Sequence, residues 1–298
     1  MSKPEIGVYL PQMGFTYDQI LHRTLLCERL DIDSLWLYDH LYGPGAPDYP
    51  SMEAWTLATA LLSRTERIRI GHMVLCNQFR HPAVLARQVT SLDHASGGRF
   101  ELGIGWGSVP SEFEVFGIGS TEPSARVGRL GESLEIMRRL WAGEVVDFQG
   151  DYFSLAGAQQ RPVPLGPIPI TIGGIGKRTL ALVREHAEWW NVPVQHLEKV
   201  DELRGEVGGA RVSYQPMVAF VSDETKRREI TDVAERRFGG TGMGSKLVIG
   251  AAPELVEHFE SLHAMGVDRF YVWFADFAPV ETLHGFSEVI ANCQSRMS

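Results

Sequence analysis

Short apolar runs alternate along the chain with longer segments in which apolar residues recur at helical spacing. The runs that predict strands lie at 6–10, 34–38, 68–75, 99–104, 168–172, 189–192, 213–221 and 269–274. The segments that predict helices lie at 16–30, 52–63, 82–95, 124–141, 177–187, 196–207, 223–237, 253–265 and 279–294. Strands that alternate with helices in this way are typical of a parallel sheet with helical crossovers.

This order of strands and helices predicts an α/β protein, a closed (β/α)8 TIM barrel with insertions after several strands. We expect one domain over residues 1–298, with a small hairpin at 147–153, a connector at 161–169 and a glycine-rich loop at 239–244. A doubly wound open sheet is the alternative. Its dinucleotide fingerprint is absent after the first predicted strand, where the sequence is Pro11-Gln12-Met13-Gly14.

Residues suited to ligand binding follow several predicted strands. In a barrel, the carboxyl ends of the strands meet at one mouth, so we expect these segments to converge there. The segments are 10–12 (LPQ), 38–40 (YDH), 73–75 (MVL), 100–108 (FELGIGWGS), 172–174 (IGG) and 190–191 (WN). This convergence predicts an enzyme.

Glycines alternate at the end of the fourth predicted strand. Gly103, Gly105 and Gly107 fall on one side of that strand, and clearing one side suits a planar ring that lies against the backbone. Trp106 and Ser108 would then line or rim the space. A tight barrel corner is the alternative, because it also requires glycine.

A second glycine segment leads from a predicted strand into a helix. Gly173-Gly174-Ile175-Gly176 precedes Lys177-Arg178 at the helix start. Exposed N–H groups and the positive end of the helix dipole there favour a phosphate, and the two cations add charge. The alternative is a plain glycine turn with two solvated cations.

His40 is the candidate proton donor or acceptor, because histidine exchanges protons near pH 7 and this one follows a strand end. A histidine that only caps a loop is the alternative. The ten histidines show no HExxH motif or comparable ligand spacing, so we expect no metal site.

The formal net charge of −9 disfavours nucleic acid or an anionic membrane as a partner. Cys27, Cys76 and Cys293 are isolated, which predicts reduced thiols in a cytoplasm. No signal peptide and no apolar segment of about 20 residues is recognisable, so we expect no membrane insertion.

Taken together, the motifs resemble the luciferase-like monooxygenase family of flavin- and deazaflavin-dependent barrels. The resemblance extends over nearly the whole chain, and its motifs include Asp39-His40, 80–86 (RHPAVLA), 92–99 (LDHASGGR), 102–105 (LGIG), 112–118 (EFEVFGI), 140–143 (LWAG) and 172–174 (IGG). Segments 177–180 (KRTL), 190–192 (WNV) and 266–270 (GVDRF) resemble the subgroup that uses coenzyme F420. FMN-dependent members share much of this frame.

The resemblance implies a role for each site segment. His40 would lie near the reactive ring of F420, or alternatively of FMN, and Asp39 would help to hold that ring. Met73-Val74 would form a bulge behind the ring, often with a cis peptide in this family. Gly105, Trp106, Gly107 and Ser108 would flank the ring, and Gly173, Gly174, Lys177 and Arg178 would take the phosphate.

Three functions remain open at this point. The first is hydride transfer between F420 and a small-molecule substrate, and the second is an FMN-dependent monooxygenase supplied by a reductase partner. The third is a non-catalytic flavin-binding barrel. The resemblance also implies a homodimer.

One residue departs from the family pattern. F420-dependent sugar-phosphate dehydrogenases of this family carry a glutamate acid where this chain has Ser108. This difference disfavours a sugar-phosphate substrate. We expect loops 41–51, 108–123 and 238–248 to shape the substrate pocket, with Tyr42, Tyr49, Trp106 and Phe113 at an aromatic rim.

Overall fold

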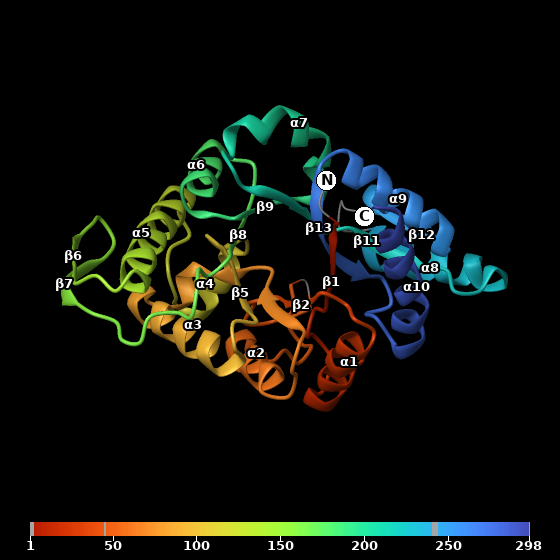
Figure 1. Ribbon diagram of the computed structural model, residues 1–298, viewed down its shortest axis with the longest axis horizontal. Helices are drawn as coiled ribbons and strands as arrows, with labels where there is room; N and C mark the ends of the chain where they lie inside the picture. The colour runs from red at the N-terminus through yellow and green to blue at the C-terminus, as the bar shows by residue number, and fades with distance from the viewer. Residues whose placement is uncertain (1–2, 45, 240–243, 298) are drawn as a thin grey trace.

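The structure is a computed structural model that describes residues 3–44, 46–239 and 244–297. Within these residues, eight parallel strand positions form a closed ring surrounded by helices (Figure 1). The strands, in ring order, are β1 (Glu5–Tyr9), β2 (Ser34–Leu37), β3 (Arg69–His72), β5 (Phe100–Gly105), β8 (Ile170–Gly173), β9 (Trp189–Val192), β10 (Arg211–Tyr214) and β13 (Val267–Phe274). Pairing of β1 with β13, in which Gly7 lies opposite Tyr271, closes the ring. The predicted (β/α)8 barrel is therefore confirmed.

The helices follow the strands around the outside of the barrel (Figure 1). They are α1 (Tyr17–Arg29), α2 (Ala54–Leu62), α3 (Pro82–Ser96), α4 (Pro110–Phe116), α5 (Pro123–Trp141), α6 (Lys177–His186), α7 (Val200–Leu203), α8 (Arg227–Phe238), α9 (Ala252–Ala264) and α10 (Val280–Arg296). Capping residues in the sequence mark the ends of several of these helices. Thr16 forms a capping box at α1, and Pro82 and Gly97 stand at the two ends of α3.

Alternation along the strands separates two apolar clusters. Ile6, Val8 and Leu35 belong to the core between strands and helices. Trp36 and Tyr271 belong to a second cluster, and their ring centroids lie 4.5 Å apart. Because successive side chains on a strand point to opposite faces, this second set fills the interior of the barrel.

A cluster of buried charged side chains lies near the amino-terminal ends of β1, β5 and β13. Arg269, which is 2% exposed, donates to Glu101 and to Glu5, whose Oε2 lies 2.6 Å from its Nη2. Its guanidinium also lies 3.9 Å from the ring centroid of Trp189. Burial raises the pKa of Glu5, but the guanidinium groups of Arg269 and Arg69 outweigh burial and hold that pKa below its usual value.

Two predicted strands are interrupted. The strand expected at 68–75 divides into β3 and β4 (Leu75–Cys76) at Met73-Val74, whose peptide bond is cis. The strand expected at 213–221 divides into β10 and β11 (Met217–Phe220), and the break includes Pro216, which has no N–H to donate. β11 also pairs with β12 (Leu247–Gly250), a strand that we did not predict.

Three further predictions need correction. The helix expected at 196–207 is a series of short turns around α7, because His196 leaves the helical region with φ −127° and ψ 22°. The predicted hairpin begins correctly, but its strands are β6 (Val146–Gln149) and β7 (Ser154–Ala158). α4 lies within the segment expected to be a loop.

Residues 240–243 of the predicted glycine-rich loop lie outside the described residues. No helix in the ranges that the structure describes combines the length and apolar character required to cross a membrane.

The ion cluster predicts a large effect of Arg269→Ala on stability. The substitution removes one of the two cations paired with buried Glu101 and leaves only Arg69, whose Nη1 lies 2.9 Å from Oε1, so we expect the free energy of unfolding to fall by up to about 3–5 kcal/mol. Denaturant titration of the purified protein measures this change. Arg296→Ala is the matched control, because its exposed pair with Glu260 is worth less than about 1 kcal/mol. Equal effects of the two substitutions would contradict the assignment.

Candidate active site

A cavity of about 320 Å³ lies at the carboxyl ends of the barrel strands. We call it the mouth pocket. Ten residues that the sequence singled out line it: Asp39, His40, Met73, Val74, Gly105, Trp106, Gly107, Ser108, Gly173 and Gly174. Five of the six segments that were expected to converge therefore contribute to one cavity. Segment 10–12 does not line it, and Gln12 instead hydrogen-bonds the backbone of Tyr38.

Lys177 and Arg178 do not line the mouth pocket. They are exposed at the start of α6, and Arg178 donates to the carbonyl of Ser124 over 3.2 Å. Gly176 is the N-cap of this helix and provides no side-chain cap. The first turn of α6 therefore keeps the character of an anion site, just outside the cavity.

The structure favours the second of the two explanations for the glycines of β5, a tight corner of the barrel. A Cβ at Gly103 would lie 1.8 Å from the carbonyl oxygen of His72, and a Cβ at Gly105 would lie 2.8 Å from Cγ2 of Val74. The cleared side of β5 is thus filled by segment 72–74 rather than left open for a ring. Gly105 and Val74 together form part of the pocket wall.

His40 is held by a buried acid. Its Nδ1 lies 2.9 Å from Oε2 of Glu112, and Oε1 of Glu112 accepts the Leu41 N–H over 2.7 Å. The side chain of Glu112 is 3% exposed, whereas that of His40 is 21% exposed. A carboxylate accepts hydrogen bonds, so this contact suits the tautomer of His40 that carries its hydrogen on Nδ1, with Nε2 outside the contact with Glu112.

Asp39 is fully engaged by the protein. Its two oxygens accept from Arg80 over 2.6 and 3.1 Å, and one of them also accepts the Cys76 N–H over 2.8 Å. Arg80 in turn donates to Glu53 over 2.6 Å. Asp39 therefore fixes the backbone of β4 and the orientation of Arg80, which does not itself line the mouth pocket.

Two other reactive side chains near the pocket are held inert. Burial lowers the pKa of His72 to about 4, so this histidine remains neutral at physiological pH. Burial also raises the pKa of Cys76 to about 12, which keeps its thiol protonated. His40, whose side chain is 21% exposed, is therefore more accessible than the fully buried His72.

A second cavity of about 290 Å³ also reaches His40, and we call it the side hollow. Leu41, Phe79 and Ile118 contribute apolar surface to it. The remaining lining residues are Asp39, His40, Ser51, Glu53 and Arg80. His40 and Asp39 thus lie between the two cavities.

Sequence reasoning missed several residues of the mouth pocket. Glu112 was quoted only as part of a motif, although Pro110 and Gly117 are ordinary signals for the start and end of a short helix. Asn191 was noted at a strand end without a role. Gln195 lies in a short 3-10 helix (Val194–Lys199) and Gln215 lies in the break between β10 and β11, so only the fold brings these residues to the pocket.

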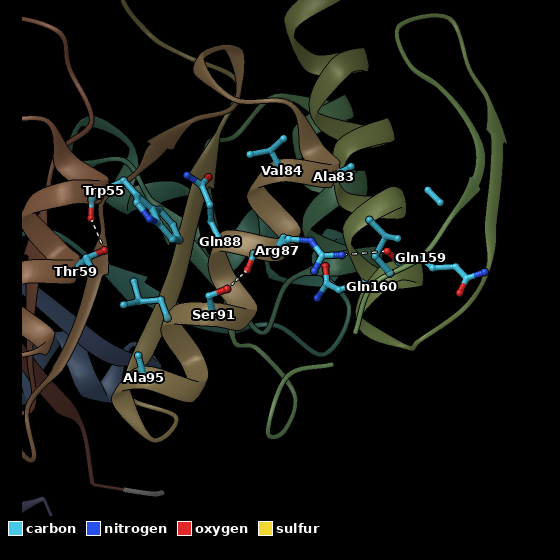
Figure 2. Close-up of a pocket in the computed structure, with 13 residues that line it drawn as sticks. Trp55, Thr59, Ala83, Val84, Arg87, Gln88, Ser91, Ala95, Gln159 and Gln160 are labelled. Carbon is cyan, nitrogen blue, oxygen red and sulfur yellow. Dashed lines mark hydrogen bonds between the residues drawn. The ribbon is translucent and has the colours of Figure 1, made fainter. Parts of the chain in front are cut away.

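A larger hollow of about 530 Å³ lies outside the barrel, along α3 (Figure 2). It runs between Trp55 and Thr59 of α2 on one side and Gln159 and Gln160 on the other, where Arg87 donates to the carbonyl of Gln159. It shares no lining residue with the mouth pocket. Its lining contains no acid and no histidine among the described residues, so it offers no general acid or base.

Similarity to known proteins agrees with this architecture. The chain is 36% identical over 180 residues to an F420-dependent glucose-6-phosphate dehydrogenase of Amycolatopsis mediterranei (strain U-32), covering 58% of this chain and 52% of that protein. It spans about half the length of the curated relatives it matches first.

Solved structures share the fold. An F420-dependent secondary alcohol dehydrogenase in complex with an F420-acetone adduct superposes with a TM-score of 0.82 at 20% identity, covering 98% of this chain and 99% of that one. EDTA monooxygenase from Chelativorans sp. BNC1 superposes with a TM-score of 0.83 at 16% identity, covering 99% of this chain and 95% of the other.

The luciferase-like monooxygenase family matches the chain over residues 1–217, which is most of its length and includes β1 to β10. Together with the closed barrel and the pocket at its mouth, this match establishes the resemblance seen in the sequence. The protein belongs to the luciferase-like monooxygenase family.

Proposed function

We propose that this protein is an oxidoreductase that transfers a hydride between coenzyme F420 and a small organic substrate. The observation that carries the proposal is the His40–Glu112 pair on the wall of the mouth pocket. F420-dependent enzymes among the curated relatives support the choice of coenzyme. A homodimer, a reductase partner and residence in a cytoplasm stay predictions from the sequence.

The residues present fit F420. The flat ring system of F420 would lie against a wall with little side-chain bulk, formed by Val74, Gly105 and Gly107. The phosphate would follow the chain from the pocket at Gly173 and Gly174 to the first turn of α6. The coenzyme carries a phosphate followed by further acidic groups. Lys177 and Arg178, which lie outside the pocket, suit this longer anionic tail better than the single phosphate of FMN.

When bound, F420 supplies the carbon that gives or accepts the hydride. The protein must move a proton to or from the substrate oxygen. Nε2 of His40 is the group that we assign to this transfer, because Glu112 occupies Nδ1. Met73, Leu75 and Trp106 line the same cavity and exclude water from the reacting atoms.

The position of the cations predicts the coenzyme preference. We expect F420 to bind at least about tenfold more tightly than FMN in fluorescence and absorbance titrations. The double substitution Lys177→Ala/Arg178→Ala should weaken F420 binding about 3- to 10-fold, as expected for two exposed charges, and FMN binding less. Arg228→Ala, an exposed cation on α8, is the control. Tight FMN binding without F420 binding would favour the FMN-dependent monooxygenase instead.

His40→Ala should lower kcat by about 10²- to 10⁴-fold, because general acid–base catalysis contributes this much. F420 affinity should change little, since other residues provide most of the pocket wall. Stopped-flow measurement of F420 reduction and coenzyme titration separate the two effects. His22→Ala, at an exposed position of α1, is the matched control. Unchanged turnover in His40→Ala would remove the assigned role and favour a non-catalytic barrel.

Glu112→Gln tests the positioning of His40. The amide of glutamine keeps one neutral acceptor oxygen, so one of the two hydrogen bonds to His40 and Leu41 is lost and the other loses its charged acceptor. We expect kcat to fall about 10- to 100-fold with KM and F420 affinity nearly unchanged. In a His40→Ala background the same substitution should have little further effect. Glu114→Gln, on the exposed side of α4, is the control. Additive effects of the two substitutions would show that Glu112 acts independently of His40.

A further inference from the structure

Charge around the reacting position disfavours an anionic substrate. Among the described residues, no lysine or arginine lines the mouth pocket. Arg80 in the side hollow is neutralised by Asp39 and Glu53. The undescribed positions 240–243 are Gly-Thr-Gly-Met and position 45 is glycine, so they bring no cation either. A phosphate beside His40 would lack a counter-charge.

Apolar surface continues from the side hollow onto α4. Tyr42 and Phe116 lie with ring centroids 6.1 Å apart, and the Tyr42 hydroxyl is 3.1 Å from Oγ of Ser111. Phe116 is 47% exposed and Val115 is 72% exposed. We call Tyr42, Val115 and Phe116 the apolar lip.

The geometry of α4 places Phe116 of the lip on the same helix face as Glu112, which contacts His40. Glu112 and Phe116 are four residues apart on α4 and therefore share one face, which meets segment 40–42. Leu41 and Ile118 of the side hollow are close neighbours of Tyr42 and Phe116 in the chain. The lip residues line neither cavity, but two of them are within two residues of apolar side chains that line the hollow.

The other two aromatic residues expected at the rim do not belong to this surface. Phe113 is 3% exposed, and its Cζ would lie 2.5 Å from a Cβ at Gly107. Tyr49 is 60% exposed, but its ring lies against Gly14 rather than α4.

We propose that the side hollow and the apolar lip form a substrate subsite, so that the enzyme acts on uncharged alcohols or ketones that carry an apolar chain or ring. The inference rests on the proposed function, because the mouth pocket must hold the F420 ring. The oxygen of the substrate lies at His40, and its apolar part extends towards Phe116 and Val115. Burial of that part against the lip provides the affinity.

The test is a substrate series with the F420-loaded protein. Propan-2-ol, octan-2-ol and 1-phenylethanol are compared with glucose 6-phosphate in F420 reduction, and the matching ketones are compared with reduced F420. We expect kcat/KM to rise about tenfold or more from propan-2-ol to the two larger alcohols, with no turnover of the phosphate ester.

The variant Val115→Ser/Phe116→Ser should raise KM for octan-2-ol and 1-phenylethanol about tenfold. Its kcat, and its KM for propan-2-ol, should stay as in the wild type. Val145→Ser is the control, because Val145 is 56% exposed between α5 and β6 and lines neither cavity. Light scattering on each variant shows whether the lip is instead covered by a second copy of the chain.

Three outcomes would overturn the subsite: preference for the phosphate ester, a chain-length dependence that survives the lip substitutions, or loss of an oligomer in the lip variant. F420 binding without turnover of any alcohol or ketone would reject the substrate class and leave the coenzyme assignment intact. Absence of F420 binding would reject the proposed function itself.

Discussion

The close approach of segment 72–74 to β5 is the constraint on which the active-site end of the barrel depends. The carbonyl oxygen of His72 lies where a side chain at position 103 would have to be, and Val74 occupies the corresponding space at Gly105. No residue other than glycine fits position 103 without moving the backbone. This contact brings Met73 and Val74 to the pocket, and it places β4 where the carboxylate of Asp39 accepts the Cys76 N–H.

Two sets of buried charges have separate functions in this barrel. Arg269 and its acidic partners lie among the amino-terminal parts of the strands, away from every residue of the mouth pocket. The Asp39–Arg80 pair and the Glu112–His40 pair lie at the carboxyl ends. Because buried charges are costly unless they are paired, each set fixes the geometry of its own end of the barrel. A change at Arg269 therefore acts on stability, whereas a change at Glu112 acts on His40.

The sequence was sufficient for the barrel and for most of the pocket, because both follow from local patterns. Strand and helix periods predict the β/α order, and strand ends predict Asp39, His40 and Gly173. The role of Gly103 stayed open between two explanations, because a pattern of glycines does not reveal whether a ligand or a neighbouring segment fills the cleared side, and the structure places the His72 carbonyl there. Glu112 was missed because its function depends on a contact 72 residues away in the sequence.

The position of the acid also bears on the chemistry. This chain has Ser108 where the resemblance leads us to expect a glutamate in sugar-phosphate dehydrogenases, and its buried acid is Glu112 on the following helix. Both oxygens of Glu112 are engaged, by His40 and by the Leu41 N–H, so this acid is not free to contact a substrate. The side chain of His40 is 21% exposed and that of Glu112 is 3% exposed, so His40 is the member of the pair that a ligand in the pocket can reach.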